Sequence, residues 1–180
     1  MSATATLLTV EEFLQLPQKE GVRLELSEGV VIEMGAGGWD HEITKANLNN
    51  LLAGWNAQTR RGKVFPESMF TLSPGEAYIP DLAWLSTERL SPGPSGRLEG
   101  APDLGIEVVS SETAAQLEKK IEAYLRHGSR AVWVAYPEQR VVRVFRRDGS
   151  SQLLQGEQIL HDPDLLPGFQ ASVSQIFEGI

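Results

Sequence analysis

The stretch APDLGIEVVSSET, residues 101–113, decides the fold because it predicts a buried strand that runs directly into a helix. The strand has two faces, which alternation assigns to Leu104, Ile106 and Val108 on one side and to Gly105, Glu107 and Val109 on the other. A single carboxylate, that of Glu107, interrupts this apolar run. An unpaired charge in such a place costs several kcal/mol. Glu107 therefore needs a cation, a hydrogen-bond partner or water, and its partner is the first question that the sequence raises.

The composition describes a chain that can bury one sizeable core. It has 180 residues, 41% of them hydrophobic, and we expect a single domain over residues 1–180. It has no cysteine, which excludes disulfides and thiolate metal sites. The formal net charge of −8 argues against a broad phosphate-binding surface. It does not exclude nucleic acid, because an acidic metal site adds negative charge and a bound cation reverses the local field.

The sequence has no targeting or membrane-spanning pattern that we can identify. The first 15 residues lack a basic region followed by an apolar core, and no later run approaches the roughly 18 apolar residues of a membrane span. We therefore expect a cytoplasmic protein that does not bind a membrane.

The hydrophobic pattern predicts an α/β (mixed α+β) fold with a central mixed β-sheet flanked by helices. The expected helices cover residues 10–16, residues 41–58 with Asp40 as N-cap, and the run between 110 and 128. Strands are expected in a hairpin around residues 27–29, at 63–67, 69–72, 78–85 and 104–109, and in a hairpin around residues 138–139. A loop and a short helix should end the chain. The segment 86–102 is long enough to be a functional flap, although a surface loop is the simpler interpretation.

Asp81 is the first candidate neighbour of Glu107. It follows Pro80 within the expected strand 78–85, so the two carboxylates converge if their strands are adjacent. Carboxylates side by side repel each other unless a proton or a cation lies between them, and hard oxygen ligands suit Mg²⁺ or Mn²⁺. For an isolated Pro-Asp pair, the simpler interpretation is a turn at the start of a strand.

Lys120 is the candidate cation. Helical spacing puts Leu117, Ile121 and Tyr124 on the buried face of its helix and Lys120 at the edge of that face, from where it reaches back over the sheet. Such a lysine can orient a water molecule or stabilise charge that develops on a phosphate. Taken alone, it is more often an edge residue with an exposed ammonium group. A buried Glu–Arg ion pair remains an alternative for Glu107.

The chain resembles the Uma-type family of endonucleases in the restriction-endonuclease-like superfamily, which is marked by a Pro-Asp, Asp/Glu-x-Lys motif. The resemblance covers nearly the whole chain and depends on RLELSEGVVIEM, WDHEI, YIPDLAWLS, PDLGIEVVSSET, the segment from Glu118 to Arg146 and the late LPGF. It implies a restriction-endonuclease-like core with an N-terminal helix and β-hairpin. The chain departs from the motif at Val109, where the usual sequence has lysine.

The resemblance also implies a set of site residues. Asp81, Glu107 and the main-chain carbonyl of Val108 would hold Mg²⁺ or Mn²⁺, with Lys120 as the displaced motif lysine. Glu25 matches the acidic residue of the N-terminal hairpin, and His41 matches the histidine before the long helix. From the residues alone, a solvated strand position for Glu25 and a capping or surface role for His41 are the simpler interpretations.

The leading functional hypothesis is a metal-dependent nuclease that hydrolyses phosphodiester bonds in nucleic acid, DNA being favoured over RNA. The alternative is a non-catalytic module on the same fold that binds protein or nucleic acid, which the acidic net charge favours. A glycosidase with two carboxylates has less support, because it gives Lys120 no role. A homodimer face at RAVWVAYP, residues 130–137, competes with simple core packing of the same residues.

Overall fold

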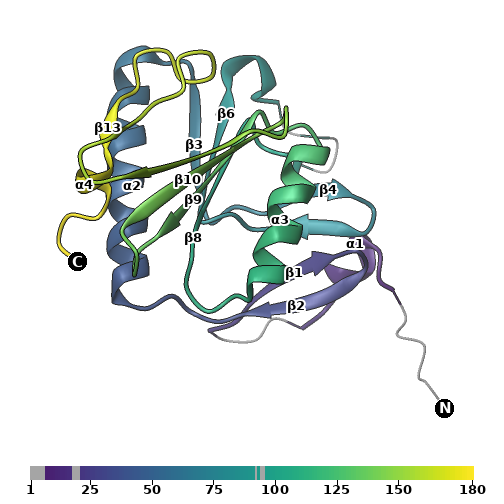
Figure 1. Ribbon diagram of the computed structural model, residues 1–180. Coiled ribbons are helices and arrows are strands. Elements are labelled where there is room, and N and C mark those ends of the chain that lie inside the picture. The colour runs from purple at the N-terminus through teal and green to yellow at the C-terminus, as the bar shows by residue number, and fades with distance from the viewer. Residues whose placement is uncertain (1–6, 18–20, 92, 94–95) are drawn as a thin grey trace.

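A six-stranded mixed sheet lies at the centre of the protein, which is described by a computed structural model over residues 7–17, 21–91, 93 and 96–180 (Figure 1). Its strand order is β11-β10-β9-β8-β6-β3. The strands are β3 (Gly62–Pro66), β6 (Leu82–Ser86), β8 (Leu104–Val108), β9 (Ala131–Tyr136), β10 (Val141–Arg146) and β11 (Ser151–Gln155). β8 and β9 run parallel, and the other neighbouring strands are antiparallel. The predicted central mixed sheet is thus confirmed.

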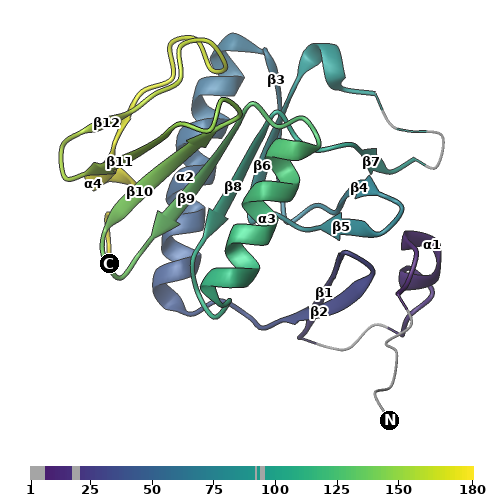
Figure 2. The same cartoon turned by 45° about the vertical axis from the view of Figure 1, so that its right-hand side comes forward.

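Two helices cover the two faces of this sheet, as Figure 2 shows: α2 (Trp39–Thr59) on one face and α3 (Ala114–Arg126) on the other. Leu104, Ile106 and Val108 pack into the same cluster as residues of α2. The alternate positions of β8 face α3 instead, where Val132 and Val134 of β9 join its apolar side chains. The two faces predicted for residues 104–109 are therefore correct, and Glu107 points toward α3.

A second sheet lies beside the first and has the order β2-β1-β5-β4-β7. Its strands are β1 (Arg23–Ser27), β2 (Val30–Met34), β4 (Phe70–Ser73), β5 (Glu76–Tyr78) and β7 (Leu98–Glu99). β1 and β2 form the predicted hairpin. Its two-residue turn, Glu28-Gly29, has φ values of 51° and 79°, as the favoured hairpin turns require.

The ends of the chain pack against these two sheets. The short helix α1 (Val10–Phe13) begins with a capping box between Thr9 and Glu12 and buries its apolar side chains beneath the β1–β2 hairpin. After β11 come β12 (Ile159–Leu160), β13 (Ala171–Ser172) and α4 (Val173–Ile176), which complete the core on the α2 side. The final short helix was predicted. β11, β12 and β13 were not, because they are short or largely exposed.

Several predicted boundaries are wrong for local reasons. The predicted strand 78–85 is two strands, since Ile79, Pro80 and Asp81 interrupt it between β5 and β6. α1 ends at Phe13 rather than at residue 16. α2 begins at Trp39 with Gly38 as N-cap, so Asp40 lies in its exposed first turn and does not cap it. The segment 86–102 contains a 3-10 turn, η1 (Thr87–Arg89), and β7, while residues 92, 94 and 95 lie outside the described part.

The segment 130–137 is part of the core. Val132, Trp133 and Val134 in β9 are at most 1% exposed, so core packing explains them and they offer no exposed dimer face.

In the described part of the chain, no helix combines the length and apolar character needed to cross a membrane.

Two glycines test how tightly these elements pack. A Cβ atom at Gly62 in β3 would lie 2.0 Å from the main-chain oxygen of Leu85, whereas one at Gly54 in α2 would meet nothing within 4 Å. We expect Gly62→Ala to lower the free energy of unfolding by about 1–3 kcal/mol or more, through overpacking. Gly54→Ala should raise it by about 0.5–1 kcal/mol, because alanine favours a helix interior. Urea denaturation of both variants measures the difference, and equal effects would contradict the β3–β6 register.

Candidate active site

Glu107 has two partners, and both come from α3. Lys120 Nζ donates to Glu107 Oε2 over 3.0 Å, and the Tyr124 hydroxyl donates to Oε1 over 2.9 Å. Lys120 and Tyr124 are one helical turn apart, so they lie on the same face of α3. All three side chains are almost completely buried. The cation opposite Glu107 is therefore a lysine, and the alternative of a buried Glu–Arg pair is wrong.

The local sequence explains why α3 presents these groups to the sheet. A capping box between Thr113 and Gln116 starts the helix immediately after β8. Leu117 and Ile121 then anchor it on the sheet, which pulls Lys120 inward to 4% exposure rather than leaving it at the edge. Gly105 leaves room for the Tyr124 ring, since a Cβ at residue 105 would lie 3.3 Å from it.

Glu25 supplies a second carboxylate to the same lysine. Its Oε1 lies 3.1 Å from Lys120 Nζ and accepts a hydrogen bond of 2.8 Å from the Ile79 main-chain N–H. The side chain is 2% exposed, so the interpretation of Glu25 as a solvated strand residue is wrong. The face of β1 that holds Glu25 is covered by α3 rather than by water.

Asp81 lies opposite Glu107, at the point where β6 begins. Leu82 pairs with Ile106, so the register continued by one residue places Asp81 across from Glu107. Asp81 Oδ2 accepts a 2.8 Å hydrogen bond from the Val108 main-chain N–H. Asp81 is both a turn residue at the start of a strand and a neighbour of β8, so the two interpretations of its Pro-Asp pair are compatible.

His41 approaches Asp81 from the other side. Its Nε2 lies 3.2 Å from Asp81 Oδ1, and its Nδ1 lies 3.1 Å from Glu42 Oε1. The ring is 4% exposed and packs against Gly37, where a Cβ would come within 2.1 Å of Nδ1. The simpler interpretation of His41 as a capping or surface residue is therefore wrong.

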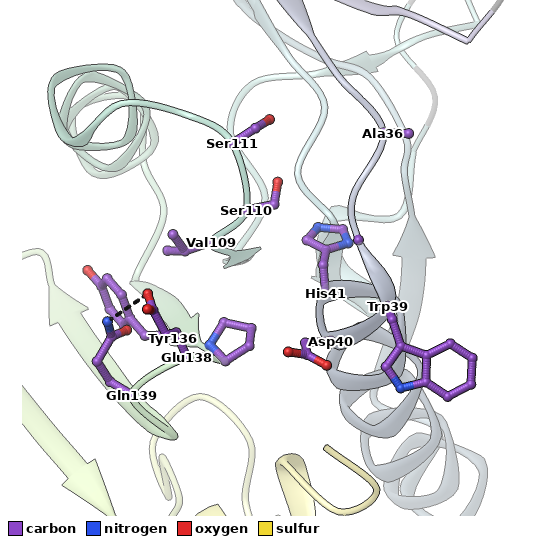
Figure 3. Close-up of a pocket in the computed structure, with 12 residues that line it drawn as sticks. Ala36, Trp39, Asp40, His41, Val109, Ser110, Ser111, Tyr136, Glu138 and Gln139 are labelled. Atoms are coloured by element: carbon purple, nitrogen blue, oxygen red, sulfur yellow. Dashed lines mark hydrogen bonds between the residues drawn. The ribbon is translucent and has the colours of Figure 1, made fainter.

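A cleft of about 560 Å³ opens beside His41 (Figure 3). One wall is the start of α2, with Trp39, Asp40 and His41. The opposite wall consists of the residues that follow β8 and the turn between β9 and β10. The cleft therefore borders His41, whose ring contacts Asp81.

An outer set of ion pairs links Asp81 to the protein surface. Arg23 lies 3.5 Å from Asp81 Oδ1 and 3.2 Å from Glu67 Oε1. Lys45 then joins Glu67 to Glu42, at 2.9 and 2.7 Å. These pairs bring β1, α2 and the segment after β3 together around the site.

The pKa values of the two central carboxylates, Glu107 and Asp81, are shifted in opposite directions. Burial raises the pKa of Glu107 to about 8, because the opposing effect of Lys120 is offset by the charges of Asp81 and Glu25. Burial also acts to raise the pKa of Asp81, but hydrogen bonds from His41 and the Val108 N–H lower it overall. Asp81 is thus ionised at neutral pH. The carboxyl group of Glu107 has a high proton affinity, so a cation that binds there competes with the proton.

The pKa shifts of the flanking groups all favour their protonated forms. Burial lowers the pKa of His41, but the hydrogen bond and the charge of Asp81 outweigh it, so the net shift is upward. The carboxylates around Lys120 outweigh its burial and raise its pKa. Burial and then the charge of Glu107 raise the pKa of Tyr124 well above its usual value, which keeps its hydroxyl as a donor.

The donor set suits a hard cation with few protein ligands. Among the described residues, no group of three or more His, Cys, Asp or Glu side chains is arranged to hold a metal. Mg²⁺ commonly binds through only one or two carboxylates, with waters and substrate phosphates completing its shell. Each Glu107 oxygen accepts one described hydrogen bond and keeps lone-pair capacity. Asp81 and Glu107 therefore fit such an ion.

Sequence reasoning brought Asp81, Glu107 and Lys120 together correctly and missed two partners. Tyr124 was assigned to the apolar face of α3, although its position four residues after Lys120 could have indicated a shared target. Arg23, whose guanidinium contacts Asp81 and Glu67, was not among the predicted site residues. The structure does not test the predicted metal-binding role of the Val108 carbonyl.

Comparisons with known proteins agree with this fold. A family model, Uma2, described as "Putative restriction endonuclease", matches residues 10–174. A crystal structure described as "a putative nuclease belonging to DUF820 from Anabaena variabilis ATCC 29413" is similar at a TM-score of 0.84 and 22% identity, over 94% of this chain and 97% of that one. No curated protein matches the chain. Because the family model spans nearly the whole sequence, this chain belongs to the Uma2 family.

Proposed function

We propose that this protein is a metal-dependent nuclease that hydrolyses phosphodiester bonds of nucleic acid, with DNA favoured as substrate. The observation that carries the proposal is the buried arrangement of Glu107, Glu25 and Asp81 around the end of β8, with Lys120 between two of the carboxylates. Family membership supports the same class of reaction. Buried charges of this kind add little to stability, which favours a functional reason for them.

Asp81, Glu107 and the main-chain carbonyl of Val108 are the groups that would hold Mg²⁺ or Mn²⁺. When bound, such an ion supplies an activated water and stabilises charge on a phosphoryl oxygen. The upward pKa shift of Glu107 supports this assignment, because burial and then the neighbouring charges of Asp81 and Glu25 disfavour its carboxylate form, which a bound cation would stabilise.

The remaining groups prepare the site for an anionic substrate. Lys120 keeps its proton and can stabilise negative charge on the reacting phosphate, while Glu25 holds its ammonium group in place. Tyr124 fixes one oxygen of Glu107. His41 orients Asp81 and lies at the cleft, where its raised pKa favours contact with a phosphate.

The first prediction about function concerns the metal. Calorimetric titration of Mn²⁺ into the protein should show binding that Asp81→Asn and Glu107→Gln each weaken at least about tenfold, because each removes an anionic ligand. Asp148→Asn is the matched control, since it removes one carboxylate from an exposed turn and should leave binding unchanged. Circular dichroism checks that each variant folds. No binding, or binding that ignores both substitutions, would favour the non-catalytic module.

The second prediction concerns the lysine. We expect Lys120→Met to lower kcat for oligonucleotide cleavage by about 10²–10³, the usual cost of losing a preorganised charge-stabilising donor. Mn²⁺ binding should survive this substitution, because both ligand carboxylates remain. Lys63→Met, at an exposed position of β3, is the matched control and should cleave normally. A Lys120→Met enzyme that is folded and fully active would contradict the proposed role.

The third prediction concerns pH. Since the folded protein raises the pKa of Glu107 from 4.5 to about 8, it retains a proton that the unfolded chain loses. The stability of the metal-free protein should therefore fall as pH rises from about 5 to 8. The raised pKa of His41 contributes with the same sign. Thermal melts should show a smaller slope in Glu107→Gln and in excess Mn²⁺. A slope in the metal-free protein equal to that of Glu107→Gln would rule out this titration.

A further inference from the structure

A second, smaller cavity lies beside Lys120, between α3 and the β1–β2 hairpin, two elements that lie next to each other in Figure 1. Its volume is about 230 Å³. That is below the roughly 300–1,000 Å³ of pockets that take whole drug-sized molecules. A single flat ring system is therefore the largest rigid group that it suits.

The walls of this cavity differ in character. The β2 part of the hairpin wall is apolar, because Val30, Ile32 and Met34 are alternate residues of β2 and share one face of the strand. Val30 is 46% exposed, although it is a large apolar side chain. The opposite wall is the first two turns of α3, where Ala115 adds a further apolar surface.

Polar groups with unused hydrogen-bonding capacity line the same space. The Gln116 side-chain oxygen accepts from Thr113 in the capping box, which leaves its amide nitrogen as a donor. Ser27 accepts from the Tyr78 hydroxyl and keeps its own O–H. Glu25 Oε1 contacts Lys120 and accepts from the Ile79 N–H. Among the described residues no donor contacts Oε2, which is therefore available as an acceptor.

We propose that this cavity receives one unstacked nucleobase of the nucleic acid whose phosphodiester is cut beside Lys120, so that the substrate is single-stranded or locally unpaired. An apolar wall with a mixed set of donors and acceptors is what recognition of an extruded base requires. Glu25 and Lys120 belong to both the cavity and the carboxylate group. A base in the cavity therefore places its neighbouring phosphate at the proposed active site. The inference rests on the proposed function for the identity of the ligand.

The two walls are joined by an interaction that opens easily. Lys119 Nζ of α3 lies 2.6 Å from Glu28 Oε2 at the hairpin turn, and both residues line the cavity and are exposed. Exposed ion pairs contribute only about 0–1 kcal/mol. A base can therefore enter without breaking an interaction on which the fold depends.

Binding can be measured apart from cleavage by labelling the methionine methyl groups for NMR. Met34 lines the cavity, while Met69 packs in the separate cluster around α1 and serves as an internal reference. A single-stranded pentadeoxynucleotide, its RNA equivalent, the DNA pentamer with an abasic central residue, and a DNA duplex are titrated in EDTA and again in Ca²⁺. We expect the Met34 signal to shift with at least one intact single strand and to shift much less with the abasic strand and the duplex.

Two neighbouring alanines supply the variants. Ala115→Phe places a ring in the cavity and should weaken binding of the intact strand at least about tenfold, the scale of one lost base contact. Ala114→Phe adds the same ring one residue away, at an exposed position outside the cavity, and should bind as the native protein does. An unchanged Met34 signal, an equal shift with the abasic strand, or normal binding by Ala115→Phe would overturn the base pocket.

The results also separate this inference from the proposed nuclease activity. If Met34 shifts but no strand is cut in Mg²⁺ or Mn²⁺, the cavity binds a base and the nuclease proposal fails. If single strands and duplexes are cut equally well and Met34 does not respond, the nuclease proposal holds and the base pocket fails.

Discussion

The contact between Glu107 and Lys120 determines how the site and the fold depend on each other. Both side chains are almost completely withdrawn from water, so neither polar end can be left without its partner. Glu107 comes from the central strand β8 and Lys120 from the helix that crosses to the parallel strand β9. The ion pair can form only when α3 docks on its own sheet. Assembly of the site is therefore part of folding rather than a later adjustment.

The position of the site follows from where chain segments end. β6 begins where the antiparallel strand β8 ends, which brings Asp81 next to Val108. α2 starts at that edge and supplies His41, while the hairpin sheet supplies Glu25 from beside α3. Residues at such ends escape the apolar packing that fills the middle of each strand, so polar chemistry can gather there without opening the core.

The sequence was sufficient to predict the central sheet, its two flanking helices and the meeting of Asp81, Glu107 and Lys120, because alternation in β8 and helical spacing in α3 are strong local patterns. It was not sufficient to predict which polar side chains are buried. Glu25 and His41 look like surface residues in their own elements, and only their packing against α3 and Gly37 removes them from water. Tyr124 was correctly placed on the buried face of α3, but its hydrogen bond to Glu107 was not predicted, because helical periodicity cannot show that a buried ring has an acceptor for its hydroxyl.

The presence of valine at position 109, directly after β8, has a physical consequence for this site. Val109 packs among the apolar residues between the sheet and α3, so this position adds hydrophobic contact and no charge. The ammonium group comes instead from Lys120, held by Glu107 below and Glu25 beside it. A lysine on a strand would depend on strand pairing alone. This one also depends on the β1–β2 hairpin, so movement of the hairpin, as when a ligand enters the cavity beside it, changes the position of the charge that the proposed reaction uses.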